Sequence, residues 1–287
     1  MKYSFMLAII CVLLFSCKEK KADNDWTKMN LKEKVKTLTE RDYYLDTTGT
    51  KKGKVLRWTY TYTFNNQGFI TEKTQMDDKG ELTVKYTYRY DTTDHLIEEK
   101  VIGDELISTS TYWYDSMGYK MICTVKPADT SAIYNIYTYT FNSKKLLIKK
   151  TMSTDNSIAA NQDKSAFSWQ YEETYTYNKD KQKVKCRHID YDSFAQTTIY
   201  NYDEQGNCIS EKTNNAKPHV VINTSRKFDK KGNEIELISY ESDGSVHAHI
   251  KHEYKSYDKQ GNWLIRSTHW KDFGTTIVER DISYFSK

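Results

Sequence analysis

The chain has 287 residues and a net charge of +4, from 43 Lys and Arg against 39 Asp and Glu. The two signs are interspersed without a basic stripe, which argues against a nucleic-acid partner. A mean hydropathy of −0.81 is in the range of disordered chains, but such chains are poor in aromatic residues. This chain holds 24 Tyr, 10 Phe and 6 Trp, so we expect a folded domain with a core built largely from tyrosine.

The N-terminus has the pattern of a signal peptide. Lys2 precedes an uninterrupted apolar run over 5–15, which is shorter than the roughly 20 residues that span a bilayer. The sequence Leu14-Phe15-Ser16-Cys17 resembles a bacterial lipobox, in which the cysteine is lipidated and becomes the new N-terminus. We predict a signal peptide over 1–16 and lipid on Cys17. An ordinary cleaved signal that ends near a cysteine is the alternative.

The residues after Cys17 indicate a cell-envelope address. Lys18-Glu19-Lys20 resembles the charged signal by which some Gram-negative lineages send lipoproteins to the outer face of the outer membrane. Residues 21–30 are polar and lack periodicity, as expected of a brief tether, and we assign 17–29 to the lipidated N-terminus and tether. Because several acyl chains anchor a protein stably, we predict an outer-membrane lipoprotein that contacts the membrane through Cys17 without crossing it. The charged signal favours the outer face, and the inner face is the alternative.

Residues 31–45 fit two patterns. Leu31, Val35 and Leu38 could mark one face of a helix, whereas Val35, Thr37 and Thr39 alternate with Lys and Glu as in a strand. We predict a strand at the edge of the sheet, where its charges would keep other chains from pairing with it.

A short phrase recurs along the rest of the chain: an aromatic residue, Asp or Asn, two variable residues and usually Gly. Successive phrases open 24 to 36 residues apart, a spacing typical of repeat architectures. Five copies keep the glycine and three lose it. The eight openings are Phe64, Tyr90, Tyr114, Phe141, Tyr177, Tyr202, Phe228 and Tyr257.

Upstream of each phrase, residues alternate with period 2, which predicts a strand. Aromatic residues lie on one face and Thr or charged residues on the other. The position two before the opening is Tyr in the first six copies, which predicts a ladder of stacked rings. The position seven past the opening is apolar in seven of eight copies, which predicts the packed face of a return strand. We expect Ile97, Ile148, Ile209, Ile235 and Leu264 to face the same side as Tyr88, Tyr139 and Tyr200, with Thr63, Thr140 and Thr176 on the other side.

The phrase itself has the chemistry of a tight turn, because Asp or Asn accepts hydrogen bonds from amides ahead and Gly adopts the left-handed conformation. A second turn closes each unit, and Pro127 and Pro218 both fall in these connections. The longest interval contains an inserted loop at 153–165. The predicted fold is all-β, with tandem β-hairpins over 30–287 in one elongated, twisted antiparallel sheet that is curled or partly spiralled.

The complete form of the phrase, aromatic-Asp-x-x-Gly-Asn, occurs at 202–207, 228–233 and 257–262. It resembles the tyrosine-aspartate (YD) repeat of the rearrangement-hotspot (RHS) family, and the resemblance covers roughly residues 44–287. It implies long antiparallel sheets that spiral, and large members of that family close into a shell around a toxin domain. This chain is similar to small lipoproteins that carry the repeat alone. The family's association with carbohydrate implies no particular binding residue here.

Three cysteines remain beyond the leader and the lipid site: Cys123, Cys186 and Cys208. An odd number cannot all pair within the chain. Equivalent positions two repeats apart are too distant for a bond if repeats stack in order. We therefore expect unpaired thiols, buried as small hydrophobic groups.

Chemical motifs are few. His247 and His249 lie two apart in a predicted strand, so they share a face and could ligate a metal. Solvent-facing histidines are the alternative, because a tetrahedral site needs further ligands with supporting partners. The sequence has no nucleophile-elbow, phosphate-loop or zinc-protease motif, and we expect no cofactor.

Trp113, Trp263 and Trp270 are the candidate ligand-contacting residues. Together with the tyrosine ladder they could stack against sugar rings or peptide side chains, or they could form the core of a sheet poor in aliphatic residues. We predict a non-catalytic binding or adhesion module for a glycan or an envelope protein. The alternatives are a histidine-dependent metalloenzyme and a purely structural envelope component.

Overall fold

The computed structural model describes residues 24–46, 53–103, 107–116, 120–127, 134–155, 167–190, 195–214, 223–271 and 273–286. The predicted all-β sheet of antiparallel hairpins is confirmed. One short helix precedes the strands, and no helix in the described ranges is long and apolar enough to cross a membrane. The elements are α1 (Asp25–Lys28), β1 (Val35–Asp46), β2 (Gly53–Phe64), β3 (Ile70–Met76), β4 (Leu82–Tyr90), β5 (Leu96–Gly103), β6 (Ile107–Tyr114), β7 (Lys120–Pro127), β8 (Tyr134–Phe141), β9 (Leu147–Asp155), β10 (Phe167–Tyr177), β11 (Lys183–Asp190), β12 (Ala195–Tyr202), β13 (Cys208–Asn214), β14 (Asn223–Phe228), β15 (Glu234–Tyr240), β16 (Val246–Tyr257), β17 (Trp263–Trp270) and β18 (Gly274–Tyr284).

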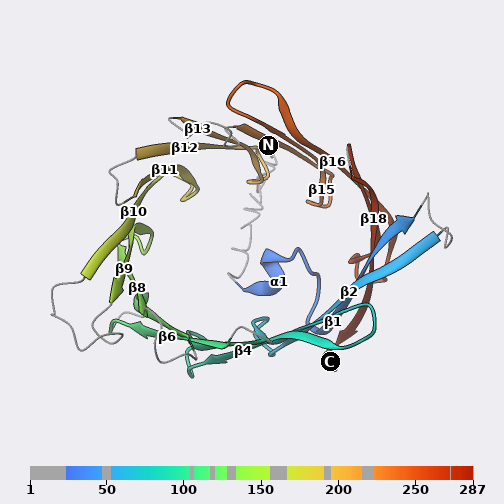
Figure 1. The fold of residues 1–287 in the computed structure, drawn as a ribbon, viewed down its shortest axis with the longest axis horizontal. Coiled ribbons are helices and arrows are strands. Elements are labelled where there is room, and N and C mark those ends of the chain that lie inside the picture. Colours follow the sequence, from blue (N-terminus) through green and yellow to red (C-terminus); the bar gives the residue numbers. More distant parts are fainter. Residues whose placement is uncertain are drawn as a thin grey trace, which may run out of the picture.

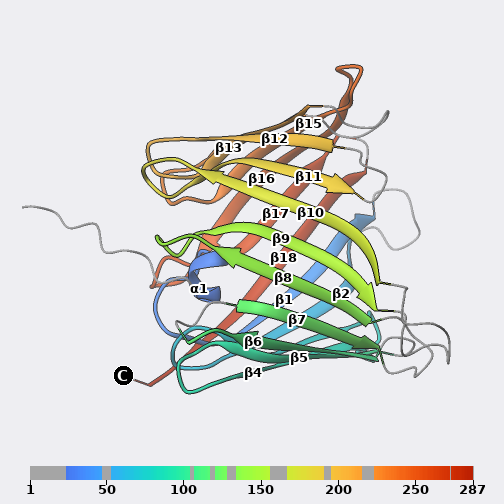
Figure 2. The same cartoon turned by 90° about the vertical axis from the view of Figure 1, so that its left-hand side faces the viewer.

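The strands form a closed ring. Each strand pairs antiparallel with the next one in the chain, and the last strand, β18, pairs with β1. Figure 1 looks along the axis of this ring, and Figure 2 shows the tilted strands from the side. The expectation that residues 31–45 form an edge strand is therefore wrong. They do form a strand from Val35, but β1 has hydrogen-bonded neighbours on both sides.

The recurring phrase forms the turn between the two strands of each hairpin, and we call it the repeat turn. In one complete copy, the Asp203 carboxylate accepts a hydrogen bond from the Asn207 amide at 2.8 Å. The Asp203 amide donates to the Asn207 carbonyl at 3.0 Å, and the Gly206 amide donates to the Asp203 carbonyl at 3.1 Å. Gly206 has a φ of 89°, a conformation that suits glycine. The predicted turn chemistry is confirmed.

The three copies without glycine keep the same turn. Asp94, Lys145 and Lys181 adopt φ values of 64°, 66° and 64° at the position where the other copies have glycine. A residue with a Cβ atom in this region is strained by about 1–2 kcal/mol.

We expect Lys181→Gly to stabilise the protein by about 0.5–1 kcal/mol, because relief of this strain exceeds the entropy that glycine adds to the unfolded chain. Chemical denaturation of the full chain measures the change. Lys179→Gly, in the same turn but outside the left-handed region, is the control and should not stabilise. Equal effects of the two substitutions would contradict the strain argument.

In four copies the tyrosine that opens the repeat turn ties its repeat to the preceding one. Its hydroxyl donates to the backbone carbonyl six residues past the opening of the previous copy, at the start of that repeat's second strand. These bonds run from Tyr90 to Ile70 at 2.8 Å, Tyr114 to Leu96 at 2.6 Å, Tyr177 to Leu147 at 2.7 Å and Tyr202 to Lys183 at 2.8 Å. The preference for Tyr over Phe at the opening thus has a physical reason.

Tyr202→Phe should destabilise the protein by about 1 kcal/mol, because the Lys183 carbonyl loses its tyrosine donor while the ring stays in place. Tyr200 lies on the same strand and face, but its hydroxyl makes no such bond to a described carbonyl. Tyr200→Phe is the control and should destabilise the protein less. Denaturation curves of the two variants give the comparison. A cost for Tyr200→Phe equal to or above that for Tyr202→Phe would refute the role of the interrepeat bond.

The inner and outer faces of the ring of strands differ in composition. Phe64 contacts Trp26, which precedes β1 and belongs to the segment inside the ring, with 6.3 Å between ring centroids. Because side chains alternate along a strand, Tyr62 shares this inner face and Thr63 faces outward. Directly opposed residues of antiparallel strands lie on the same face, so the register extends the assignment around the ring.

The strand register confirms a prediction about faces. The tyrosines two positions before each opening lie on the same face as the apolar residues seven positions after it. Tyr88, Tyr139 and Tyr200 oppose Glu99, Lys150 and Glu211, each two residues after Ile97, Ile148 and Ile209. This shared face is the inner one, and its side chains are half-buried. Lys73 lies over the rings of Tyr60, Tyr62 and Tyr86 at 5.7, 5.6 and 5.1 Å. The inner face is thus lined by tyrosine and charge, and burial raises the pKa of the Tyr200 hydroxyl to about 12.

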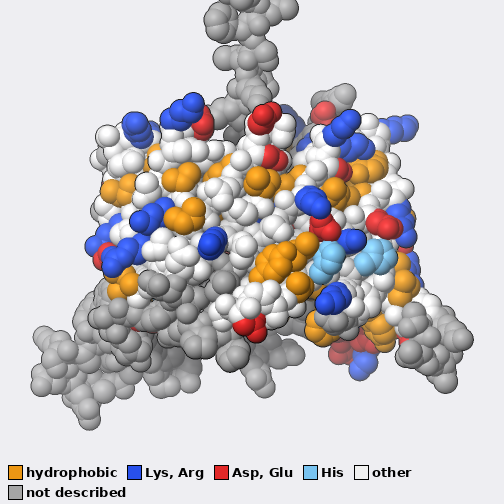
Figure 3. Space-filling model, turned by 90° about the horizontal axis from the view of Figure 1, so that it is seen from above, with side chains coloured by type: hydrophobic (Ala, Val, Ile, Leu, Met, Phe, Trp, Pro, Cys, Tyr) orange, Lys and Arg blue, Asp and Glu red, His pale blue; other side chains and the backbone are white. Residues whose placement is uncertain are grey.

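The outer face carries threonine and ion pairs between neighbouring strands, a composition suited to water. Examples are Lys85 with Glu72 at 2.7 Å and Lys227 with Glu236 at 2.6 Å. Figure 3 shows charged side chains of both signs spread over one side of the outer wall.

Residues 24–34 cross one end of the ring from inside, and we call them the N-terminal strap. The Asn24 side chain accepts from the Thr27 amide at 3.0 Å and caps α1. The strap contacts three repeat turns: Asn24 donates to the Gln67 carbonyl, Asn30 to the Asn233 side chain, and the Lys32 amide to the Asn262 side chain at 2.7, 3.0 and 2.7 Å. Residues 24–29, which the sequence predicted to belong to a tether, are therefore packed against the ring.

Leu31 of the strap packs on Val35, Leu38 and Phe64 in a buried hydrophobic cluster. Cys186 and Cys208 are free thiols, as predicted, and burial raises the pKa of both. Three parts of the chain lie outside the described residues: residues 1–23 with Cys17, the side chain of Cys123, and the loop at 156–166.

Candidate ligand-binding site

The two candidate metal ligands lie on the outer face of β16, as their spacing predicts, but each has its own acidic partner. His247 Nδ1 is 2.5 Å from Glu241 Oε1, and His249 Nε2 is 2.9 Å from Glu236 Oε1. No group of three His, Cys, Asp or Glu side chains in the described part of the chain could hold a metal ion.

The three candidate tryptophans occupy different environments. Trp113 is 50% exposed on the outer face of β6. Trp263 is only 6% exposed and packs between Tyr254 and the Arg280 guanidinium, whose carbon lies 3.3 Å from the Trp263 ring centroid. Trp270, at the end of β17, is 36% exposed and lines a cavity. The structure does not bring the three tryptophans together in one site, and of the three only Trp270 lines the cavity.

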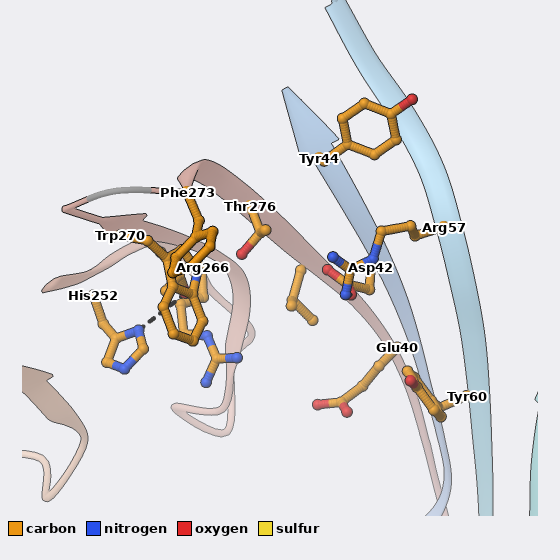
Figure 4. Close-up of a pocket in the computed structure, with 12 residues that line it drawn as sticks. Glu40, Asp42, Tyr44, Arg57, Tyr60, His252, Arg266, Trp270, Phe273 and Thr276 are labelled. Carbon is orange, nitrogen blue, oxygen red and sulfur yellow. Dashed lines mark hydrogen bonds and ion pairs between the residues drawn. The ribbon is translucent and has the colours of Figure 1, made fainter. Parts of the chain in front are cut away.

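This cavity of about 570 Å³ lies on the inner face, at the end of the ring away from the repeat turns. Figure 4 shows Asp42 and Arg57 on one side of it and His252, Arg266, Trp270 and Phe273 on the other. We call it the seam pocket, because strands from both ends of the chain meet there. Its lining residues are Glu40, Asp42, Tyr44, Arg57, Tyr60, His252, Arg266, Thr268, Trp270, Phe273, Thr276 and Val278.

Ring closure assembles the seam pocket. Asp42 of β1 lies directly opposite Val278 of β18, and Val278 lies opposite Arg266 of β17. Thr268 opposes both His252 and Thr276. Residues more than 200 positions apart in the sequence thus share one wall because β1 pairs with β18.

Two ion pairs organise the charged side of the pocket. Arg57 Nη2 lies 3.0 Å from Asp42 Oδ2, and Arg280 donates through Nε and Nη2 to Glu40 Oε1, each at 2.8 Å. Burial raises the pKa of the Asp42 carboxyl, while Arg57 and Arg266 oppose that shift. Burial also lowers the pKa of the Arg280 guanidinium, against the pull of Glu40. Both carboxylates are therefore held by guanidinium groups.

Aromatic and neutral polar groups complete the pocket. Trp270 and Phe273 present rings at its mouth, and Phe273 is 84% exposed. His252 Nδ1 and Thr268 Oγ1 are 3.0 Å apart, which fixes the imidazole on the inner face. The combination of exposed ring faces and a few oriented polar groups can bind a small polar ligand.

Sequence reasoning missed most of this site. Glu40, Asp42, Arg57 and Arg266 belong to strands that look like the others, and no local motif marks them. The available signal was the alternation in β1, which places Glu40 and Asp42 on the same face as Leu38. Acidic residues on the face that also carries a buried leucine are unusual enough to suggest a polar site.

Comparisons with known proteins are limited to structure. No family model matches the chain, and no curated protein matches it. It is similar to a porin-like protein from Bacteroides uniformis ATCC 8492, at 16% identity over 87% of this chain and 98% of that one, with a TM-score of 0.44. It is also similar to a porin-like protein from Bacteroides vulgatus ATCC 8482, at 11% identity over 88% of this chain and 99% of that one, with a TM-score of 0.38.

The Tc holotoxin pore of Photorhabdus luminescens is similar at 12% identity over 78% of this chain, with a TM-score of 0.30. This chain spans only 15% of that one. At such identities and TM-scores none of these likenesses carries an argument about activity.

Proposed function

We propose that this protein is a lipid-anchored, non-catalytic glycan-binding protein of the cell envelope and that its ligand occupies the seam pocket. The observation that carries the proposal is the pairing of exposed rings, Trp270 and Phe273, with oriented charged groups in one cavity. The volume of about 570 Å³ falls within the roughly 300–1,000 Å³ of small-molecule sites.

A saccharide suits both halves of the pocket. The C–H faces of a sugar ring can pack on Trp270 and Phe273 as other apolar groups do on aromatic rings. Its hydroxyls can donate to Asp42 and accept from Arg57, whose charges strengthen such bonds. Because Asp42 and Glu40 each already bind a guanidinium, neither is available as a free acid or base, which favours binding over hydrolysis.

The strap supports an orientation of the pocket relative to the membrane. Asn24 is bound at the repeat-turn end through the Gln67 carbonyl, and Figure 2 shows α1 and the C-terminus at that same end. Asn24 is seven positions after Cys17, a stretch that spans at most about 25 Å when extended. Lipid on Cys17 would therefore hold the repeat-turn end toward the membrane. Trp270 and Phe273, at the opposite end, would face outward.

Mass spectrometry of the native protein tests the anchor. We expect acyl chains on an N-terminal Cys17, and Cys17→Ala should move the protein from the detergent phase to the aqueous phase. A mature N-terminus downstream of Cys17 without lipid would overturn this part of the proposal.

A glycan array followed by calorimetry on the full chain in detergent tests the binding function. Trp270→Ala should weaken binding of any glycan found by about tenfold or more, because it removes the largest ring of the pocket. Trp113→Ala removes an equally large, more exposed ring from the outer face and is the matched control, with unchanged affinity expected. Absence of glycan binding would overturn the proposal in favour of a structural role. Cleavage of a bound glycan, or loss of function in His247→Ala with a stoichiometric metal present, would instead indicate an enzyme.

A further inference from the structure

One arginine of the seam pocket has no carboxylate partner. Arg57 and Arg280 each have a carboxylate partner, at 3.0 and 2.8 Å. No carboxylate among the described residues lies within 4.0 Å of the third guanidinium, that of Arg266. Asp42 is thus paired with Arg57, and Glu40 is paired with Arg280, which is not a lining residue, so Arg266 is the lining guanidinium left without a carboxylate partner.

Arg266 is also incompletely hydrogen-bonded. Its Nε is buried and has no hydrogen-bond partner, and its guanidinium carbon lies 5.1 Å from the Trp263 ring centroid. A buried donor without a partner costs about 1–3 kcal/mol, and more when the group is charged. A ligand that brings an anionic oxygen to this guanidinium would supply the charged partner that no carboxylate of the described residues provides. Figure 4 shows Arg266 beside Trp270 and Phe273 and facing the same cavity.

We propose that the seam pocket selects acidic saccharides and that Arg266 holds their anionic group, a carboxylate or a sulfate, while Trp270 and Phe273 pack on the sugar ring. This inference rests on the proposed glycan-binding function. A guanidinium matches the two oxygens of such a group through parallel N–H···O bonds, which a neutral sugar cannot offer. The remaining positive charge of the pocket is then neutralised by the ligand.

The test compares three probes on the full chain in detergent at neutral pH: an oligogalacturonate, its methyl ester and a sulfated neutral oligosaccharide. The ester keeps the sugar backbone but replaces each carboxylate by a neutral methyl ester, so it lacks the negative charge. We expect the acid to bind about tenfold to hundredfold more tightly than the ester, as for a hydrogen bond to a charged group. The sulfated probe shows whether the site also accepts a tetrahedral anion.

Arg266→Gln should reduce the affinity for the acid to that for the ester and leave the ester unchanged. Arg89→Gln, which removes an exposed arginine of the outer face, should keep the difference between the two probes. Arg266→Lys keeps the charge and should retain part of the preference. If Arg266→Gln does not fold, the probes on the unaltered chain test the acidic preference, and an undiminished preference in Arg266→Lys would count against the role of Arg266.

The outcomes separate the two proposals. Equal binding of acid and ester to the unaltered chain would overturn the acidic preference and leave the glycan-binding function standing. A preference for the acid that survives in Arg266→Gln would overturn the role of Arg266. If no saccharide of either kind binds, the glycan-binding function itself fails, and this inference fails with it.

Discussion

Gly68→Ala should destabilise the protein by roughly 2–5 kcal/mol, because it adds a clash to backbone strain. A Cβ at this position would lie 2.5 Å from Trp26 and 2.6 Å from the Asn24 side chain. The φ of Gly68, 89°, is also unfavourable for any residue with a Cβ atom. The strap would have to leave the repeat turn, which would expose the hydrophobic cluster beneath it.

Gly261→Ala is the matched control for Gly68→Ala. Gly261 occupies the same place in its repeat turn with a φ of 88°, but a Cβ there has no neighbour within 4 Å. Only the strain of about 1–2 kcal/mol should remain. Chemical denaturation measures both variants, and limited proteolysis near Trp26 reports release of the strap in Gly68→Ala alone. Equal destabilisation by the two substitutions would show that strap docking adds nothing to stability.

Glu40→Leu should destabilise the protein by about 3–5 kcal/mol, because it leaves the charge of Arg280 buried without its partner. The Arg280 side chain is 6% exposed, and its pairing with Glu40 joins β18 to β1, the strands that close the ring. The double variant Glu40→Leu with Arg280→Met should recover most of this loss, since an apolar pair of similar size carries no charge that needs solvation.

Asp281→Ala gives the comparison on the outer face of the same seam. Asp281 pairs with Arg41 across β18 and β1 at 2.5 Å, but its side chain is 67% exposed. Exposed pairs contribute about 0–1 kcal/mol, so a small effect is expected. Thermal and chemical unfolding of the three variants test the argument. If Asp281→Ala proves as costly as Glu40→Leu, or if the double variant recovers nothing, the buried pair is not what stabilises the seam.

The sequence by itself determined the repeating unit, because the unit depends on short-range chemistry. Asp203 and Gly206 show how the repeat turn is specified. The Asp203 carboxylate accepts a hydrogen bond from a backbone amide four residues on, and Gly206 adopts the left-handed conformation that the turn needs. The alternation of Thr63 and Phe64 specifies which side chains share a face, since the side-chain period of a strand is two. These local rules hold in every described copy of the turn, including the one in which Lys181 replaces glycine.

Tertiary structure alone decided how the units are assembled and where the site lies. The strand pattern of β1 is compatible with an edge, and only its pairing with β18 makes it part of a closed ring. Trp263 and Trp270 belong to the same strand, yet one is buried against Arg280 and the other borders the seam pocket. The physical reason is that ring closure and strap docking depend on contacts between residues more than 200 positions apart, such as Lys32 with Asn262, and no local period records such contacts.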